Sequence, residues 1–136
     1  MSSGYWGGAE SSCDADDWFK TGDLALMESD GRLRLMGRLK ELVIVSGFNV
    51  YPIEVEGFFN ALQEVVECAA VGVPDDRSGE AVTLFVVLHA GAGLAAIKTH
   101  AENGLAPYKR PRTYVQLDEL PKTAIGKIDR RALLPK

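Results

Sequence analysis

The residue with the clearest potential for chemistry is Lys127, which directly follows a glycine in the stretch LPKTAIGKIDRR. A lysine on a glycine-containing turn is a movable positive charge that suits a phosphate, although the same side chain is equally stable in water. The phosphate-binding pattern GxxxxGK[ST] is absent, because Pro121 stands five residues before Gly126 and Ile128 follows the lysine. Taken alone, the dipeptide therefore favours an ordinary solvated cation on a surface turn.

The other side chains with typical catalytic or metal-binding chemistry do not form a familiar pattern. Cys13 and Cys68 are too few and too far apart for a disulfide framework or a CxxC site, and His89 and His100 have no metal-ligand spacing with them. We therefore expect no metal site in this chain. Two free cysteines favour a reducing compartment.

Size and charge exclude some classes of protein. A chain of 136 residues predicts one domain, with room for part of another. The net charge of -4 argues against a dedicated nucleic-acid binder, which usually carries a basic excess. Basic residues do gather near the C-terminus, and such clusters are commonly solvated surface; they are Lys109, Arg110, Arg112, Lys122, Lys127, Arg130, Arg131 and Lys136.

One uncharged stretch, Ala81 to Ile97, approaches the length that crosses a membrane. His89 and the Ala-Gly-Ala-Gly run interrupt it, so we expect a buried strand followed by the start of a helix. The N-terminus also lacks the basic and apolar regions of a signal peptide. These features predict a cytoplasmic protein without a transmembrane segment.

The first half of the chain predicts two hairpins and a helix. Residues 1–17 read as loop. Strands at 24–27 and 32–36 flank Ser29-Asp30-Gly31, and strands at 42–45 and 48–50 flank Ser46-Gly47. A helix should begin at Pro52, because the residues that follow recur with helical spacing: Val55, Phe58, Phe59 and Leu62.

The second half predicts buried strands at 66–73 and 81–88, joined by a loop over 74–79. Helical spacing follows at Leu94, Ile97, Ala101 and Leu105, and a further strand is expected at 113–117. Asp129 can cap a short final helix. Strands and helices mixed in this way, without strict alternation, indicate the α+β class.

Three stretches of the chain stand out when they are taken in order: WFKTGDLA (18–25), GRLKELVIVSGFNVYPIEVE (37–56) and LPKTAIGKIDRR (120–131). Together they resemble the last signature motifs of AMP-forming acyl-CoA synthetases of the fatty-acid and 4-coumarate type. These enzymes belong to the adenylate-forming superfamily. LAPYKRPRTYV (105–115) is similar to the segment that this family places between the second and third motifs. Several motifs in one order are far more specific than any one of them.

The resemblance implies a two-step ligase reaction. ATP, with Mg2+, converts a carboxylic or fatty acid to an acyl-adenylate, and coenzyme A then displaces AMP. It also implies a division of the chain: residues 1–37 would end a large N-terminal adenylation domain, which is the expected partner, and residues 38–136 would form its mobile lid. Such a lid is a small mixed domain, with a β-hairpin and a short, mostly antiparallel sheet packed by helices.

The same resemblance assigns roles to individual residues. Asp23 would accept hydrogen bonds from the ribose hydroxyls of ATP, and Arg38 would contact the same nucleotide. Lys40 falls at the family's hinge position. Lys127 takes the position of the lysine that stabilises charge during adenylation.

Two further groups of residues are implied to contact coenzyme A. Ser46, Gly47 and Phe48 would border the passage for its pantetheine arm, and a glycine there allows close backbone approach. Lys109, Arg110 and Arg112 would meet its phosphates, because a basic rim attracts a polyanion.

The family's phosphate loop, adenine-binding segment and acyl pocket do not occur in this sequence. We therefore expect this chain to be inactive alone. Two alternatives stay open: a non-catalytic α+β interaction module, and the lid of a peptide-synthetase adenylation domain. VSGFNVYPIEVE is more similar to the acyl-CoA-forming branch.

Overall fold

The computed structural model of the chain describes residues 21–135. They fall into two compact units that divide between Lys40 and Glu41. This division lies three residues beyond the boundary that the resemblance implies, and the domain assignment itself stays a prediction. Cys13, the predicted loop at 1–17 and the first residues of the WFKTGDLA motif lie outside the described residues.

The first unit contains an antiparallel hairpin of β1 (Asp23–Met27) and β2 (Leu33–Arg38), as predicted. Its turn is held by the Glu28 N–H, which donates to the Arg32 carbonyl at 2.8 Å. The side chain of Asp30 accepts hydrogen bonds from the backbone and from Nε of Arg32. A bulge at Leu24/Ala25 shifts the register near the end of the ladder where Asp23 pairs with Arg38.

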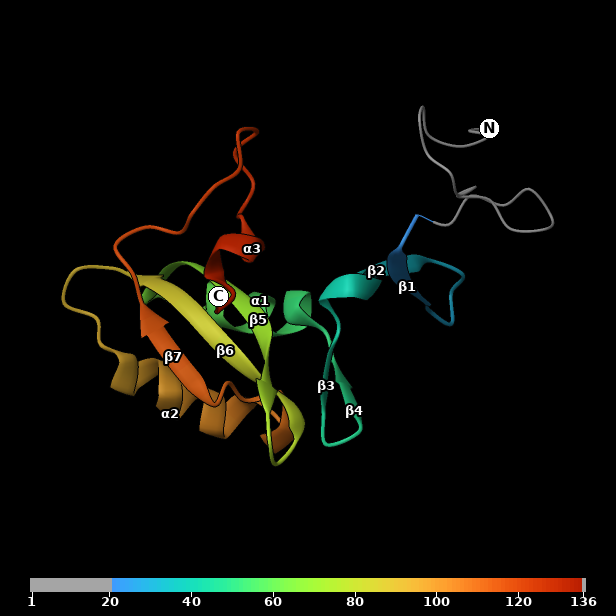
Figure 1. The fold of residues 1–136 in the computed structure, drawn as a ribbon, viewed down its shortest axis with the longest axis horizontal. Coiled ribbons are helices and arrows are strands. Elements are labelled where there is room, and N and C mark those ends of the chain that lie inside the picture. Colours follow the sequence, from blue (N-terminus) through green and yellow to red (C-terminus); the bar gives the residue numbers. More distant parts are fainter. Residues whose placement is uncertain (1–20, 136) are drawn as a thin grey trace. The chain divides into compact units, whose positions relative to one another are not determined.

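The second unit is built on a five-stranded sheet (Figure 1). Along one edge of β6 (Gly79–Leu88) lies β5 (Val65–Asp75), and along its other edge lie β3 (Val43–Val45) and β7 (Thr113–Gln116). The outermost strand, β4 (Phe48–Val50), pairs with β3. Only the β6–β7 pair is parallel, so the sheet is mostly antiparallel, as expected.

The predicted loop at 74–79 is wrong in its extent. Pro74 and Asp75 continue β5, and Gly79 already pairs with Asp75 at the start of β6. The turn is this tight because the carboxylate of Asp75 accepts hydrogen bonds from the backbone of Arg77 and from both the backbone and the hydroxyl of Ser78. An aspartate that organises its own turn shortens the loop that composition alone suggests.

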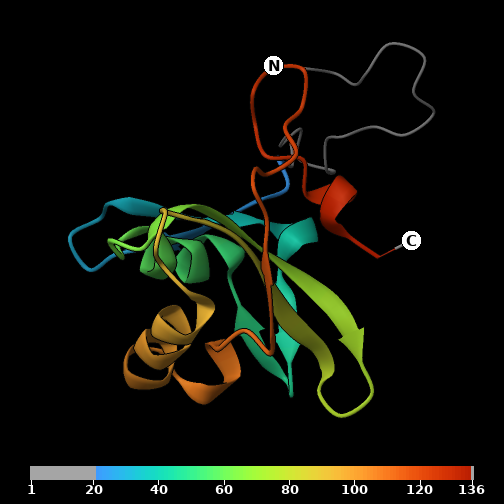
Figure 2. The ribbon, with the colours of Figure 1, turned by 90° about the vertical axis from the view of Figure 1, so that its left-hand side faces the viewer.

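Helices α1 (Pro52–Asn60) and α2 (Leu94–Gly104) lie on the same side of the sheet (Figure 2). They contribute Val55, Phe59, Ile97 and Ala101 to a core that also takes the inward residues of the strands. Phe58 and Leu62, predicted on one buried helical face, are only partly buried, and Leu62 lies two residues beyond the end of α1. The spacing of the two helical faces therefore gave the correct elements, with a modest error in which side chains are fully covered.

The opposite face of the sheet is covered by the C-terminal segment. Ala69 and Val71 of β5 point to this side and pack with Leu120 and Leu133. Leu133 ends α3 (Arg130–Leu133), the short helix predicted after Asp129. The stretch from Ala81 to Ile97 forms β6 and the start of α2, and no helix in the described part of the chain is long and apolar enough to cross a membrane.

Candidate functional site

Lys127 lies on a tight hairpin that extends from the second unit. Lys122 and Ile128 form an antiparallel bridge, and the Thr123 N–H donates to the Lys127 carbonyl at 2.6 Å. The Gly126 N–H returns to the Thr123 carbonyl at 2.9 Å, with Gly126 at a φ of 85°. Only glycine adopts this left-handed conformation without strain, so the glycine before Lys127 is required by the turn.

The ammonium group of Lys127 is exposed on this ordered turn. The Lys127 N–H also faces the Thr123 hydroxyl at 3.3 Å, so the backbone on both sides of the side chain is held. An exposed cation on a fixed backbone can approach an anionic substrate without rebuilding the loop. The geometry is thus compatible with a charge-stabilising role and gives the Gly126-Lys127 dipeptide a structural basis.

The base of the hairpin is fixed by Asp129. Its N–H donates to the Pro121 carbonyl at 2.8 Å, which closes the hairpin. Its carboxylate accepts hydrogen bonds from the N–H groups of Arg131 and Ala132, as a helix N-cap does. The predicted capping role of Asp129 is confirmed, and it connects the hairpin to α3.

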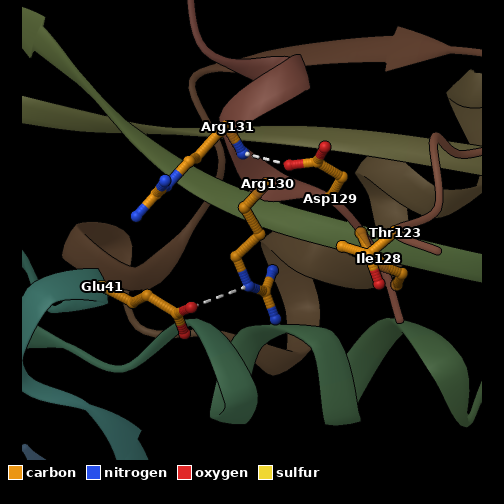
Figure 3. Close-up of a pocket in the computed structure, with 6 residues that line it drawn as sticks. All are labelled: Glu41, Thr123, Ile128, Asp129, Arg130 and Arg131. Carbon is orange, nitrogen blue, oxygen red and sulfur yellow. Dashed lines mark hydrogen bonds and ion pairs between the residues drawn. The ribbon is translucent and has the colours of Figure 1, made fainter. Parts of the chain in front are cut away.

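Directly after this cap, the Arg130 guanidinium makes a two-point ion pair with Glu56 of α1 (Nη2–Oε2 3.0 Å). Its Nε also lies 3.5 Å from Oε1 of Glu41. Figure 3 marks this ion pair with a dashed line. Arg130 and Glu41 line a pocket of about 380 Å³, together with Thr123, Ile128, Asp129 and Arg131. Sequence reasoning gave Glu56 no role, although it occupies a position on the apolar face of α1.

The environment keeps this arginine charged. Burial alone would lower the pKa of Arg130, but the hydrogen bond to Glu56 and the negative charges of Glu56 and Glu41 outweigh it and raise the pKa. Glu56 is 8% exposed, and it also accepts a hydrogen bond from the Ala70 N–H at 2.9 Å. A buried charge is stable when it is paired and hydrogen-bonded in this way.

The predicted passage for coenzyme A begins at the turn between β3 and β4. Ser46 and Gly47 both have positive φ, 51° and 83°, which defines the two-residue turn with a twist that suits adjacent strands. The Ser46 N–H donates to the Ser78 carbonyl at 2.8 Å, which joins this turn to the β5–β6 turn. The hairpin prediction is confirmed, and the hairpin alone already explains Gly47.

Phe48, the third residue of this group, stacks on Tyr108 with ring centroids 4.5 Å apart. Tyr108 in turn lines a pocket of about 200 Å³ together with Val45, Arg110 and Arg112. Phe48 is 54% exposed despite the stacking. The structure therefore brings the predicted passage residues and both predicted phosphate-binding arginines to one region of the second unit.

Each of the three predicted phosphate-binding cations also has a partner within the chain. Lys109 pairs with Glu54 at 2.9 Å, and this hydrogen bond raises the pKa of Lys109. Arg110 donates to the carbonyls of Leu105 and Glu102 at the end of α2.

Arg112 pairs with Asp75 at 2.5 Å. The hydrogen bonds from Arg112 and then Ser78 hold the pKa of Asp75 well below its usual value. Contacts of all three cations with coenzyme A stay a prediction, and they would use donors left over from these bonds.

In the first unit, Asp23 and Arg38 lie opposite each other in the β1–β2 ladder and form an ion pair. Lys40 is the last residue before the division between the units. Within residues 21–135, no group of three His, Cys, Asp or Glu side chains could hold a metal ion. The Mg2+ that the resemblance implies therefore has no ligand set here to which it can be assigned.

The fold and the lysine hairpin define a small α+β domain with an exposed charge on a rigid turn, and comparison with known proteins gives its class. The model of the AMP-binding enzyme C-terminal domain matches residues 54–127. The chain belongs to this family.

Similar proteins extend the match beyond that range. The chain is 44% identical to the long-chain-fatty-acid–CoA ligase of Yersinia pestis over 133 residues, which is 96% of this chain and 24% of that protein. ATP-bound MatB from Rhodopseudomonas palustris has a TM-score of 0.82 at 38% identity, over 90% of this chain and 25% of that one. The chain thus spans about a quarter of these relatives and matches the C-terminal quarter of the ligases.

A third relative was solved with a reaction intermediate. The o-succinylbenzoate CoA synthetase of Bacillus subtilis, in complex with its acyl-adenylate, has a TM-score of 0.83 at 32% identity, over 90% of this chain and 25% of that one. Relatives of this chain therefore bind ATP and an acyl-adenylate.

Proposed function

We propose that this chain is the lid of a longer acid–CoA ligase, which activates a carboxylic acid with ATP and transfers the acyl group to coenzyme A. The observation that carries the proposal is the Lys127 hairpin: an exposed ammonium on a turn fixed by Gly126, Thr123 and Asp129, in a chain of the AMP-binding enzyme C-terminal domain family. Residues 1–37 would belong to the large domain, and residues 38–136 would form the lid.

In the first half-reaction, a carboxylate oxygen attacks the α-phosphorus of ATP, and pyrophosphate leaves. Negative charge is concentrated around the α-phosphoryl oxygens as the two anions meet. The ammonium of Lys127 would lie against these oxygens and offset that charge without transferring a proton. Asp23 and Arg38 would hold the ribose and the nucleotide from the first unit.

In the second half-reaction, the thiol of coenzyme A attacks the acyl carbon of the adenylate, and AMP leaves. Ser46, Gly47 and Phe48 would border the pantetheine arm. Arg110 and Arg112 line the adjacent pocket, and with Lys109 they would attract the phosphates. Lys40 would be the hinge that exchanges the two faces of the lid, and the division of the chain directly after this residue supports that position.

The relatives support a proposal for the substrate class. The Yersinia protein is a long-chain-fatty-acid ligase, which supports a fatty acid as the substrate. The MatB and o-succinylbenzoate enzymes share the same lid fold, so the fold by itself does not select the acid. We place the reaction in the cytoplasm, where ATP and coenzyme A are available.

The direct test is product analysis of the full-length enzyme with ATP, coenzyme A and a panel of carboxylic acids from acetate to long-chain fatty acids. We expect release of AMP and pyrophosphate and formation of an acyl-CoA. Release of pyrophosphate with an amino acid, and no thioester with coenzyme A, would instead indicate a peptide-synthetase lid. Absence of pyrophosphate release with every acid would indicate a non-catalytic module.

The 136-residue chain should form no acyl-adenylate, because most of the groups that position the substrates lie outside it. Acid-dependent exchange of pyrophosphate into ATP by the purified chain would contradict this expectation.

A further inference from the structure

Arg130 occupies the point at which three segments of the second unit meet. Its guanidinium contacts both carboxylate oxygens of Glu56 on α1 and the Ala70 carbonyl of β5 at 3.4 Å. Its Nε faces Glu41, the first residue after the division between the two units. Figure 3 shows the side chain extending from α3 toward α1 and Glu41.

A short covalent path connects Arg130 to the exposed lysine. Asp129, its neighbour, closes the base of the hairpin by donating to the Pro121 carbonyl. Ile128 is the bridge partner of Lys122 and packs against the cluster formed by Ala69, Val71, Leu120 and Leu133. Lys127 is the next residue along this path, directly before Ile128 in the sequence. A shift of the Arg130 backbone would therefore be transmitted along three residues that are each hydrogen-bonded or packed.

The other strand of the hairpin has a weaker anchor. Lys122 pairs with Glu67 of β5 at 2.6 Å, with side chains 40% and 31% exposed. The side chains of Arg130 and Glu56 are 24% and 11% exposed. Exposed pairs contribute little because water competes for both charges, whereas a partly buried two-point pair fixes both distance and direction.

We propose that Arg130 is a positioning residue for Lys127: its two-point contact with Glu56 and its contact with Glu41 set the direction in which the hairpin presents the lysine. This inference rests on the proposed function of Lys127. A guanidinium is required rather than any cation, because its planar fork meets both carboxylate oxygens, whereas a lysine ammonium is a single point of charge. Stability alone does not require an ion pair here, since apolar residues of similar size often replace a buried pair without loss.

The test uses four variants of the full-length enzyme: Arg130→Lys, Lys127→Ala, the double variant, and Arg131→Gln as the control at the exposed neighbouring arginine. Adenylation is measured by acid-dependent pyrophosphate exchange, and thioester formation is measured separately from preformed acyl-adenylate. Urea unfolding checks that each variant is folded.

We expect Arg130→Lys to lower kcat for adenylation roughly 10- to 100-fold, the loss typical of a misplaced catalytic group. The KM for ATP and the rate of thioester formation should each stay within about threefold of the wild-type value, a factor worth about 0.65 kcal/mol. The double variant should be no slower than Lys127→Ala, since a misplaced lysine and a missing one remove the same interaction. Arg131→Gln should resemble wild type.

If Lys127→Ala is slow, the proposed function stands, and any of three results would then overturn this inference by itself. They are adenylation at the wild-type rate by Arg130→Lys, equal loss in both half-reactions by Arg130→Lys, and losses that multiply in the double variant. Failure of Arg130→Lys to fold would also overturn it, because the pair would then serve stability. If Lys127→Ala itself adenylates at the wild-type rate, the proposed function of that lysine fails and the inference falls with it. Glu41→Gln provides a milder second variant, for which we expect the same selective loss at smaller size.

Discussion

Arg38 and Asp23 face each other at the open end of the β1–β2 hairpin, with Nε of the arginine 2.9 Å from Oδ1 of the aspartate. Arg38 also approaches the Thr21 carbonyl at 3.4 Å, and the Thr21 hydroxyl accepts from the Asp23 N–H at 3.3 Å. The two side chains are 62% and 37% exposed. Two residues predicted to contact one nucleotide are therefore adjacent, and the arginine holds the aspartate in place.

The first prediction concerns this pair. Asp23→Ala in the full-length enzyme should raise KM for ATP roughly 10- to 100-fold, because hydrogen bonds to a charged group contribute about 1.5–3 kcal/mol. Stability should change by less than about 1 kcal/mol, since the pair is exposed. Asp30→Ala is the matched control, because Asp30 pairs with Arg32 at the other end of the same hairpin. Equal effects of the two variants on KM would contradict the nucleotide role.

The second prediction compares two glycines in left-handed conformations. Gly126 and Gly47 have φ of 85° and 83°, and an added Cβ would meet nothing within 4 Å at either position. Each alanine variant should therefore lower the free energy of unfolding by about 1–2 kcal/mol, because a residue with a Cβ is strained in the left-handed conformation. Gly126→Ala should slow adenylation selectively, and Gly47→Ala should slow thioester formation selectively. Rates of the two half-reactions check this, and the same pattern for both variants would refute the separation of the two faces.

The third prediction concerns the hinge. Lys40→Pro fixes φ at one residue and should impair thioester formation more than adenylation. Lys40→Ala, which keeps the backbone free, should leave both steps near the wild-type rate. Stopped-flow measurement of adenylation and of thioester formation in the two variants checks this prediction. Equal loss in both steps for Lys40→Pro would argue against a hinge at this position.

The fourth prediction concerns pH and Cys68. Burial, followed by the charge of Glu56, raises the pKa of Cys68 from 9.0 to about 12. Below pH 9 the thiol is protonated in both the folded and unfolded chains and adds no pH dependence. Above it, only the unfolded chain releases the proton, so the free energy of unfolding should fall by up to about 1.4 kcal/mol per pH unit. Urea unfolding between pH 8 and 11 should show that the free energy of unfolding declines less steeply with pH for Cys68→Ala than for the wild type. Identical slopes would refute the raised pKa of Cys68.

Local patterns in the sequence predicted most of the fold. The Ser46-Gly47 turn, the cap at Asp129 and the helical faces depend on residues a few positions apart, and the structure confirms them. The extent of β5 and β6 was missed because Asp75 folds its own turn through Ser78. Composition alone cannot reveal such side-chain hydrogen bonds.

The Arg130–Glu56 pair was missed for a different reason. Its two residues lie 74 positions apart, and no local rule connects them. One signal was available: Glu56 stands among Pro52, Val55 and Phe59 on the buried face of α1. A single charge on an apolar helical face requires a buried partner. The pairs of Lys109 and Arg112 with Glu54 and Asp75 were equally invisible, because a basic cluster looks the same whether or not its members are paired.

The fifth prediction concerns Lys127, and its measurement is the rate of acyl-adenylate formation by Lys127→Ala in the full-length enzyme. Lys98→Ala, at an exposed lysine of α2, is the control. We predict a loss of roughly 100-fold or more in adenylation, comparable to removing one electrostatic stabiliser of a transition state. The reverse reaction should fall equally, while thioester formation from preformed adenylate stays near wild type and folding is unchanged. Adenylation by Lys127→Ala within about threefold of wild type, worth only ~0.65 kcal/mol, would contradict the catalytic role and leave Lys127 as a solvated cation on a surface turn.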